Sequence, residues 1–314
     1  MCLVALALDQ SRRFPLVIAA NRDEFFDRPT ARLAWWQPGA DAPAILGGRD
    51  LSAGGTWLGL TLAGRLAFVT NVRDPSQRDP AAPSRGEIVT RWLSGQQNAD
   101  RFWTQTALSG YNGFNLVMAD FQDGACYYAT SLQTQPRRLE RGLHAVSNGL
   151  LDEPWPKTEA LRHRVHVALN RHAGLDGLID ELFSALADRH EYDDDALPST
   201  GVPIEWERAL SAAFSRTDDG RYGTRSSTLV ITERVHKRLV THVLERSFAA
   251  QGRGALLRHA VIRGWPPKYG SVAALPAPPI QADEIRETEL AQAVADAPPA
   301  RKTRVRTLIR PLRR

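Results

Sequence analysis

The amino-acid sequence predicts one antiparallel α+β domain, and three observations carry this prediction. Apolar runs of strand length fill the first 72 residues, helical periodicity dominates the middle of the chain, and strand-like runs return at residues 227–245. The connections between successive strand-like runs have hairpin length, whereas parallel strands need crossovers of a dozen residues or more. With 314 residues, of which 43% are hydrophobic, the chain can bury a substantial core.

The chain begins with a predicted hairpin. Residues 2–8 and 15–20 are apolar runs around a polar loop, a pattern typical of a hairpin that is buried on both faces. If this hairpin is symmetric about Arg12, Cys2 lies opposite Arg22. A second pair of strands is expected within residues 56–72. The glycine pairs before it are expected to shape loops, because glycine permits positive φ and close backbone approach.

The remaining elements follow in chain order. Ser84 and Glu87 have the spacing of a capping box ahead of a helix, and a second helix is predicted at residues 99–108. Apolar residues then recur with strand, helical and again strand spacing. The sequence therefore predicts strands at residues 115–120, 125–130, 137–141 and 143–147, helices through 161–169, 178–186 and 206–214, and strands at 227–233 and 239–245.

The domain is predicted to cover residues 1–250, and residues 251–314 are predicted to be a Pro-rich, basic C-terminal extension. From residue 265 onward the chain holds eight of its 20 prolines, and from residue 297 it holds seven basic residues and no acidic one. Because this composition offers little apolar surface, we expect a mostly disordered segment with at most a short helix at residues 283–295. It is either a solvated extension or an arm that contacts anionic surfaces.

Composition excludes several classes of protein. The net charge of +5 is concentrated in the extension, so that nucleic-acid binding by the domain is not expected. Two cysteines are too few for a disulfide framework and fit a reducing compartment. The first apolar run is too short for a signal peptide, and no stretch approaches the ~18 apolar residues of a membrane span. The eight histidines show no ligand spacing. We therefore expect a cytoplasmic protein without a membrane span, a metal or a cofactor.

Cys2 is the candidate nucleophile. Removal of Met1 would place a free α-amino group on the same residue as the thiol. An α-amine has an unperturbed pKa of about 7.7 to 8.0 and can accept the thiol proton at neutral pH. The alternative interpretation is a small buried hydrophobic residue at the start of a strand.

A polar cluster follows the second apolar run. Asn21, Arg22, Asp23 and Glu24 come directly after residues 16–20. Arg22 is expected to lower the pKa of the Cys2 thiol, and either Asp23 or Glu24 to hold the α-ammonium. The alternative is a charged turn whose ion pair contributes little.

Further motifs follow in order over about 250 residues, at residues 1–2, 19–25, 28–29, 54–59, 70–71, 84–87, 111–116, 146–148, 154–157, 223–225 and 245–248. On these motifs the sequence resembles the NRDE family, also known as the transport and Golgi organisation type 2 proteins. That family in turn resembles the N-terminal-nucleophile hydrolases, in particular the choloylglycine hydrolase and penicillin V acylase group. The resemblance implies a four-layer αββα sandwich with antiparallel sheets.

The resemblance also implies a set of site residues. The catalytic residues would be Cys2, Arg22, Asp23, Asn71, Asn148 and Arg225, with Asn21, Glu24 and Trp57 as binding residues. The hydrolases space their Arg and Asp three apart, whereas Arg22 and Asp23 are adjacent here. Either Asp23 or Glu24 therefore plays the acid's part, and either Arg22 or Asn21 replaces the arginine.

These residues have defined roles in the implied chemistry. The side-chain amides of Asn71 and Asn148 would donate to an oxyanion, at about 2.7 to 4 kcal/mol per donor. Arg225 would order the N-terminus or bind a substrate carboxylate, and Trp57 would wall an apolar pocket. The alternatives are turn residues for the two asparagines, a sheet-edge cap for Arg225 and core packing for Trp57.

Two functions compete. One is an N-terminal cysteine amidohydrolase that acts on a non-peptide amide or a thioester. The other is a non-catalytic carrier on the same scaffold, since members of the NRDE family are associated with haem trafficking and with lipid or acyl-coenzyme A metabolism. The sequence contains no Cys-Pro or CxxCH haem motif. A third interpretation is a folded domain whose basic tail engages a partner.

Overall fold

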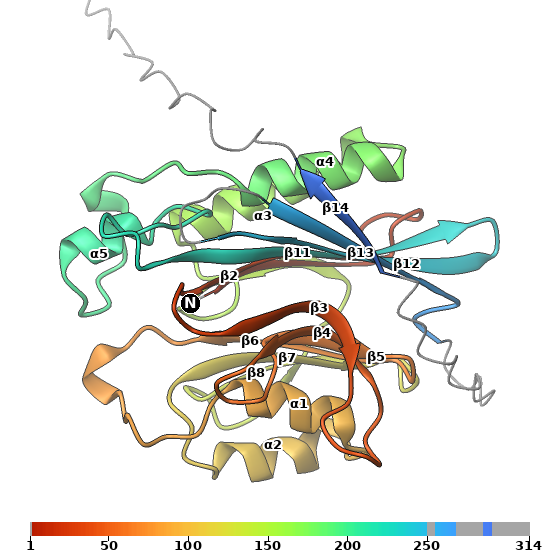
Figure 1. Cartoon of the computed structure of the whole chain (residues 1–314), viewed down its shortest axis with the longest axis horizontal. Coiled ribbons are helices and arrows are strands. Elements are labelled where there is room, and N and C mark those ends of the chain that lie inside the picture. Colours follow the sequence, from red (N-terminus) through yellow and green to blue (C-terminus); the bar gives the residue numbers. More distant parts are fainter. Residues whose placement is uncertain (1, 250–254, 268–284, 291–314) are drawn as a thin grey trace, which may run out of the picture.

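A computed structural model describes residues 2–249, 255–267 and 285–290 as four stacked layers, with helices outside two antiparallel sheets (Figure 1). Sheet A contains, in spatial order, β10 (Gly142–Val146), β1 (Cys2–Leu8), β2 (Leu16–Phe25), β11 (Tyr222–Val235), β12 (Arg238–Ser247), β13 (Ala255–Arg263) and β14 (Arg286–Leu290). Sheet B contains β3 (Thr30–Trp36), β4 (Ile45–Asp50), β5 (Leu58–Thr61), β6 (Arg65–Asn71), β7 (Phe114–Asp120), β8 (Ala125–Thr130) and β9 (Arg137–Arg138).

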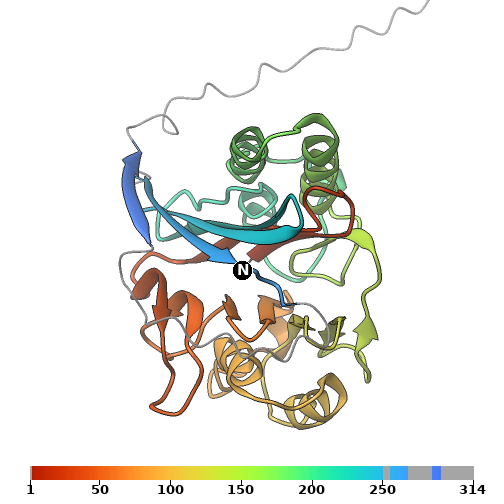
Figure 2. The same ribbon diagram turned by 90° about the vertical axis from the view of Figure 1, so that its right-hand side faces the viewer.

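The helices form the two outer layers, as the view in Figure 2 shows from the side. Apolar faces of α3 (Pro156–Arg171) and α4 (Leu175–Leu186) pack on sheet A, and those of α1 (Gly86–Ser94) and α2 (Ala99–Ala107) pack on sheet B. The short α5 (Ile204–Ala209) precedes β11. Within the described residues, no helix has the length and apolar character needed to cross a membrane. The predicted αββα sandwich with antiparallel sheets is confirmed.

The hairpin of β1 and β2 has the predicted register. Cys2 pairs with Arg22, and the pairing continues to the end of both strands. Val4 and Ile18 point into the core between the two sheets, whereas Leu3 and Ala19 pack under α3 and α4. Because side chains alternate along a strand, Cys2 and Arg22 both lie on the side of sheet A that faces sheet B.

Several local predictions are corrected by the structure. β3 and β4 lie between the two predicted pairs of strands, and Gly47 and Gly48, which were expected to shape a loop, lie within β4. Gly48 is required by close approach, because a Cβ atom there would lie 2.2 Å from the Trp57 ring. The capping box is also wrong: Arg85 is the N-cap of α1 and no side chain caps this end. The strand at residues 137–141 and the helix at 206–214 are shorter than predicted.

Part of the segment that the sequence predicts as an extension belongs to sheet A. β13 pairs with β12 along sheet A, and Ala260, Ile262 and Trp265 are buried in the core between the sheets. Residues 286–290 form β14 rather than a helix, because their backbone extends the same sheet. The sequence analysis grouped these residues with the proline-rich segment, because Pro266 and Pro267 follow β13 closely, although six of the nine residues of β13 are apolar. The remainder of the predicted disordered extension lies outside the described residues.

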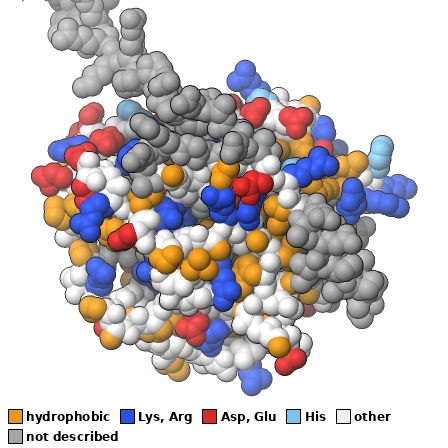
Figure 3. All heavy atoms as spheres, in the orientation of Figure 1, with side chains coloured by type: hydrophobic (Ala, Val, Ile, Leu, Met, Phe, Trp, Pro, Cys, Tyr) orange, Lys and Arg blue, Asp and Glu red, His pale blue; other side chains and the backbone are white. Residues whose placement is uncertain are grey.

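The surface is mixed in charge where Figure 3 displays it. Basic, acidic and apolar side chains are interspersed on this face of the molecule. This face therefore presents no continuous basic surface of the kind that binds a nucleic-acid backbone.

The position of Trp265 generates the first prediction. Its side chain is 1% exposed and its indole Nε1 donates to the Thr61 carbonyl at 2.8 Å, which ties the chain after β13 to sheet B. We expect Trp265→Ala to lower the free energy of unfolding by about 3 to 5 kcal/mol, as for other buried large-to-small changes. Urea unfolding measures this, with Trp206→Ala as the control, because Trp206 is 37% exposed. Equal losses in the two variants would show that residues beyond 250 contribute nothing special to the core.

Candidate active site

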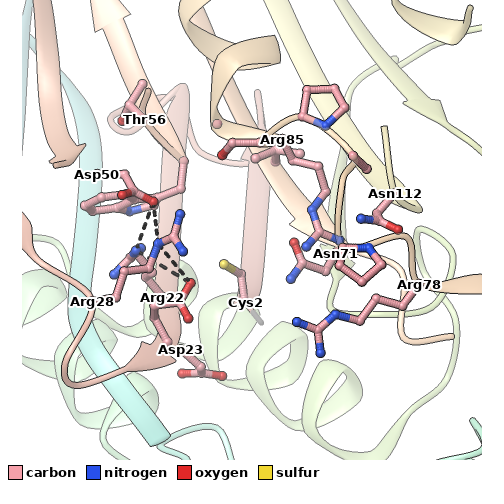
Figure 4. A pocket seen from close by; sticks show the side chains of 18 of the residues that line it. Cys2, Arg22, Asp23, Arg28, Asp50, Thr56, Asn71, Arg78, Arg85 and Asn112 are labelled. Carbon is pink, nitrogen blue, oxygen red and sulfur yellow. Dashed lines mark hydrogen bonds and ion pairs between the residues drawn. The ribbon is translucent and has the colours of Figure 1, made fainter. Parts of the chain in front are cut away.

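A cavity of about 290 Å³ opens beside the first residue of β1. Its walls come from the ends of β2, β4 and β6 and from the loop that leads into α1. Six of the predicted site residues line it, namely Cys2, Arg22, Asp23, Glu24, Trp57 and Asn71. Three others do not, namely Asn21, Asn148 and Arg225. Figure 4 shows the Cys2 thiol between an ion-paired group around Arg22 on one side and Asn71, Arg78 and Arg85 on the other.

Cys2 is buried but reaches the cavity. It has 9% of its surface exposed, and its carbonyl accepts a hydrogen bond from Ser147 Oγ at 3.0 Å. Burial raises the pKa of the thiol, and the nearby Arg22 opposes this shift without overcoming it. Arg22 thus acts on the pKa of the thiol in the expected direction, although burial leaves that pKa above its ordinary value. A thiol in this position needs a base to become a nucleophile.

Arg22 is held by four contacts. Its guanidinium carbon lies 4.3 Å from the centre of the Trp57 ring, and its Nη1 donates to Thr30 Oγ1 at 3.4 Å. Its Nη2 lies 3.8 Å from Glu24 Oε2 and 3.9 Å from Asp50 Oδ2. These contacts fix the cation beside Cys2, and they show that Trp57 supports Arg22 as well as lining the cavity.

The same carboxylates also bind Arg28. The Arg28 Nε donates to Asp50 Oδ2 at 2.7 Å, and these carboxylates raise the pKa of Arg28 against the effect of burial. Asp50 in turn accepts backbone hydrogen bonds from Ser52 and Ala53, which fixes the turn after β4. The two arginines and two carboxylates form a neutral cluster, called here the paired wall of the cavity.

The two candidate acids differ in their surroundings. Asp23 is 2% exposed, its Oδ1 accepts from Thr224 Oγ1 at 2.7 Å, and burial raises its pKa. Glu24 is half-buried, and its Oε1 accepts from the backbone N–H of Phe25 while Oε2 belongs to the paired wall. A buried carboxylate gains most from a cationic partner, so Asp23 is better suited than Glu24 to hold an α-ammonium group.

The two predicted oxyanion donors are in different positions. Asn71 ends β6 and its side chain lines the cavity. Asn148 is 1% exposed, its Nδ2 donates to the Asn71 carbonyl at 2.9 Å, and its Oδ1 accepts from Arg73 at 3.3 Å. The amide of Asn148 is thus used to hold the end of β6, and only Asn71 presents its amide to the cavity.

Asn21 has a structural role on the opposite face of β2. Its Nδ2 donates to the carbonyls of Leu186 and Ala213, each at 2.8 Å, and its Oδ1 accepts from Ser227 Oγ at 2.6 Å. These hydrogen bonds tie β2 to α4, to the segment after α5 and to the neighbouring strand β11. Arg22, and not Asn21, is the residue of this pair that faces the cavity, because adjacent strand residues point to opposite faces.

Arg225 also lies away from the cavity. A bulge between Thr224 and Ser226 makes Arg225 the extra residue of β11. Its Nη1 donates to the carbonyls of Phe25 at 2.6 Å and Arg28 at 3.0 Å. Arg225 thus holds the turn after β2 from an interior strand of sheet A, and it does not line the cavity.

A buried charged group behind Cys2 was missed by the sequence analysis. Lys157 in the first turn of α3 is 3% exposed, and its Nζ donates to the Leu210 carbonyl at 2.7 Å. Burial and the nearby charge of Arg73 lower the pKa of Lys157 to about 7. Arg73 donates to Glu207, which also accepts from the backbone N–H of Thr200 at 2.9 Å. The signal was available, because Lys157 ends one of the motifs that carry the family resemblance.

The arrangement suits acyl transfer to sulfur. It combines a thiol, a fixed guanidinium, a side-chain amide donor and a buried carboxylate around one cavity. Among the described residues, no three or more His, Cys, Asp or Glu side chains form a group that could hold a metal ion.

The sequence matches a known family and its curated members. The family model described as Transport and Golgi organisation 2 matches residues 1–250. The human Transport and Golgi organization protein 2 homolog is 31% identical over 251 residues, which cover 74% of this chain and 89% of the relative. The mouse homolog is 29% identical with the same coverage, and the Drosophila melanogaster protein is 25% identical over 278 residues, which cover 76% of this chain and 89% of that protein.

Solved structures with a similar arrangement are more distant. A Caenorhabditis elegans N-acylethanolamine-hydrolyzing acid amidase ortholog is 11% identical with a TM-score of 0.38, covering 73% of this chain and 92% of that one. A variant of conjugated bile acid hydrolase from Clostridium perfringens is 10% identical with a TM-score of 0.39, covering 76% of this chain and 90% of that one.

The two cysteines are expected to differ in reactivity. Burial in β8 raises the pKa of Cys126 to about 12, whereas Cys2 reaches the cavity beside Arg22. We expect iodoacetamide at pH 8 to label Cys2 at least about tenfold faster than Cys126, because thiolate content and access control the rate. Peptide mapping by mass spectrometry measures both, and Cys126→Ala serves as the control that leaves labelling of Cys2 unchanged. Preferential labelling of Cys126 would contradict this account of the site.

Lys157 is expected to make stability depend on pH. Between its folded pKa of about 7 and the ordinary value of 10.5, the unfolded chain binds more protons at this residue than the folded protein. The free energy of unfolding of the wild type, relative to Lys157→Met, should therefore rise as the pH increases through this window. Urea unfolding at several pH values measures the difference, with the exposed Lys237→Met as control. A difference that does not change with pH would mean that Lys157 keeps its charge in the folded protein.

Proposed function

The chain belongs to the Transport and Golgi organisation 2 family, and we propose that it is an N-terminal cysteine amidohydrolase that cleaves a non-peptide amide or a thioester. One observation carries this proposal: the β1–β2 register places the Cys2 thiol beside Arg22 and in a cavity that the Asn71 amide also lines. A buried cysteine with only a structural role would need neither the cation nor the cavity.

The raised pKa of Cys2 defines what the chemistry requires. A buried thiol is protonated at neutral pH, so that a base must take its proton as the sulfur attacks. After removal of Met1, the α-amine of Cys2 is the nearest base by covalent connection. Asp23 would hold the resulting α-ammonium, while Arg22 would stabilise negative charge on sulfur.

The proposed reaction has two steps. In the first, the α-amine accepts the thiol proton, Cys2 Sγ bonds to the carbonyl carbon, and the carbonyl oxygen becomes an oxyanion that accepts from Asn71 Nδ2. The carbon–nitrogen bond then breaks, the proton passes from the α-ammonium to the leaving amine, and a thioester remains on Cys2. In the second step, water attacks the thioester with the α-amine as base, which releases a carboxylic acid and restores the thiol.

Location and cofactor use follow as parts of the proposal. Cys2 and Cys126 are both free thiols, which fits action in the reducing cytoplasm. Hydrolysis through a thioester consumes only water, so the proposed reaction requires no cofactor.

Amide hydrolysis tests the proposal directly. The probes are N-acyl derivatives of 7-amino-4-methylcoumarin with acetyl, succinyl and lauroyl groups, since cleavage of each amide releases a fluorescent amine. We expect hydrolysis that falls more than about 10³-fold in Cys2→Ala, as for the loss of other nucleophiles. Asp23→Asn should reduce the rate with little change in the thermal midpoint, since its proposed partner is the α-ammonium.

Cys126→Ala is the matched control and should retain activity, because Cys126 lies in β8 outside the cavity. Activity that survives in Cys2→Ala would contradict the proposed nucleophile. Binding of haem or acyl-coenzyme A by a protein that hydrolyses none of the three amides would favour the carrier alternative over the amidohydrolase.

A further inference from the structure

The wall of the cavity opposite the paired wall has a different electrostatic character. It comes from the segment between β6 and α1 and carries Arg78 and Arg85 (Figure 4). Within the part of the chain that the structure describes, neither guanidinium forms an ion pair with a carboxylate. Arg85 Nη1 donates to the Gly113 carbonyl at 3.0 Å, and Arg78 is exposed at the rim. This surface is called here the unpaired wall.

The backbone of the unpaired wall is held in place. The side chain of Asn112 accepts from the Asp79 N–H at 2.8 Å and donates to the Asp79 carbonyl at 2.7 Å. At the other end of the segment, Thr56 N–H donates to the Gly86 carbonyl at 3.2 Å. A Cβ atom on Gly55 would lie 2.5 Å from the backbone of Gly86, so this contact admits only glycine at residue 55. The loop that carries Arg78 and Arg85 is therefore held in one conformation by these contacts.

The charges on this wall are poorly compensated. Arg85 is half-buried, and burial, together with repulsion from Arg78, lowers its pKa. Asp79 lies in the same loop, and its Oδ1 accepts from the backbone N–H of Ala81 at 2.8 Å. A half-buried guanidinium without a carboxylate partner loses hydration that an anionic ligand would replace.

We infer that the unpaired wall binds an oxyanion, a carboxylate or a phosphate, on the molecule whose carbonyl reaches Cys2. Arg85 and Arg78 provide planar guanidinium groups that match such oxygens in pairs. The inference rests on the proposed function for the role of Cys2 as the nucleophile, but binding of an anion by Arg78 and Arg85 requires no catalysis. It assigns to Arg78 and Arg85 the substrate-binding role that the sequence suggested for Arg225, whose guanidinium is bonded to the turn after β2.

A comparison of how fast a charged and a neutral reagent alkylate Cys2 tests this inference and does not require catalytic activity. Iodoacetate and iodoacetamide deliver the same carbon to sulfur but differ by one negative charge. The measured ratio is the alkylation rate with iodoacetate divided by the rate with iodoacetamide. We expect this ratio to be at least about tenfold higher for Cys2 than for glutathione, because a cationic wall concentrates anions near the thiol. The excess should fall as sodium chloride is added.

Variants locate the effect. Arg78→Gln with Arg85→Gln should return the ratio to that of glutathione, and Arg85→Lys should retain part of the excess. Arg101→Gln is the control, because Arg101 is exposed on α2 and its loss changes the net charge without touching the cavity. A wild-type ratio equal to that of glutathione, or a ratio unchanged in the double variant, would overturn the inference.

A second measurement covers the case in which Cys2 resists both reagents. Phenylglyoxal modifies accessible arginines, and peptide mapping reports Arg85 and Arg78 separately from Arg101. Succinate or inorganic phosphate should slow modification of Arg85 several-fold relative to chloride at equal ionic strength, and the more protective anion identifies the group. Lack of protection by both anions overturns the inference. If an anion protects Arg85 from modification but the protein hydrolyses none of the amides, the anion site is supported and only the proposed amidohydrolase activity is rejected.

Discussion

The pairing of β1 with β2 is the constraint on which the site depends. If β1 shifted by one residue relative to β2, the Cys2 side chain would point toward α3 and α4. Arg22 would then lie on the opposite face of sheet A, because side chains alternate between the faces of a sheet. The register is strongly specified, since both strands are buried on both faces by cores of different composition. β2 also pairs with β11, which supplies Thr224 to Asp23. One strand thus positions the cation and the buried acid beside the thiol.

The ionisable groups buried around this hairpin lose hydration, which lowers the stability of the folded protein. A hairpin with only a structural role would contain no such groups. Burial raises the pKa of Cys2 and of Asp23 and lowers that of Lys157, so each of the three groups is pushed toward its neutral form. Cys2 and Asp23 line the cavity, whereas Lys157 does not, and a group of titratable residues with displaced pKa values is typical of sites that move protons. The two arginine walls divide the same cavity between a neutral cluster that holds Arg22 and a cationic surface that faces it.

The sequence predicted the Cys2–Arg22 pair, because the hairpin is short, symmetric and strongly apolar, whereas the four layers were expected from the family resemblance. It did not separate Asn148 from Asn71 as cavity residues, since both are strand-end asparagines and only the tertiary contact through the Asn71 carbonyl distinguishes them. The position of Arg225 outside the cavity depends on a bulge in β11, and such a bulge cannot be predicted from periodicity. Trp265 and β13 were missed because they were grouped with the proline-rich segment that begins at Pro266, although β13 itself contains no proline.

If the thiol and its base belong to one residue, the mature chain must begin at Cys2. Intact-mass spectrometry of the purified protein, with N-terminal sequencing of the same sample, measures this directly. We expect most molecules to lack Met1 and to carry a free α-amine on Cys2. Retention of Met1 in most molecules, or a blocked amine on Cys2, would contradict the proposed mechanism, because the buried thiol would then have no base within its own residue.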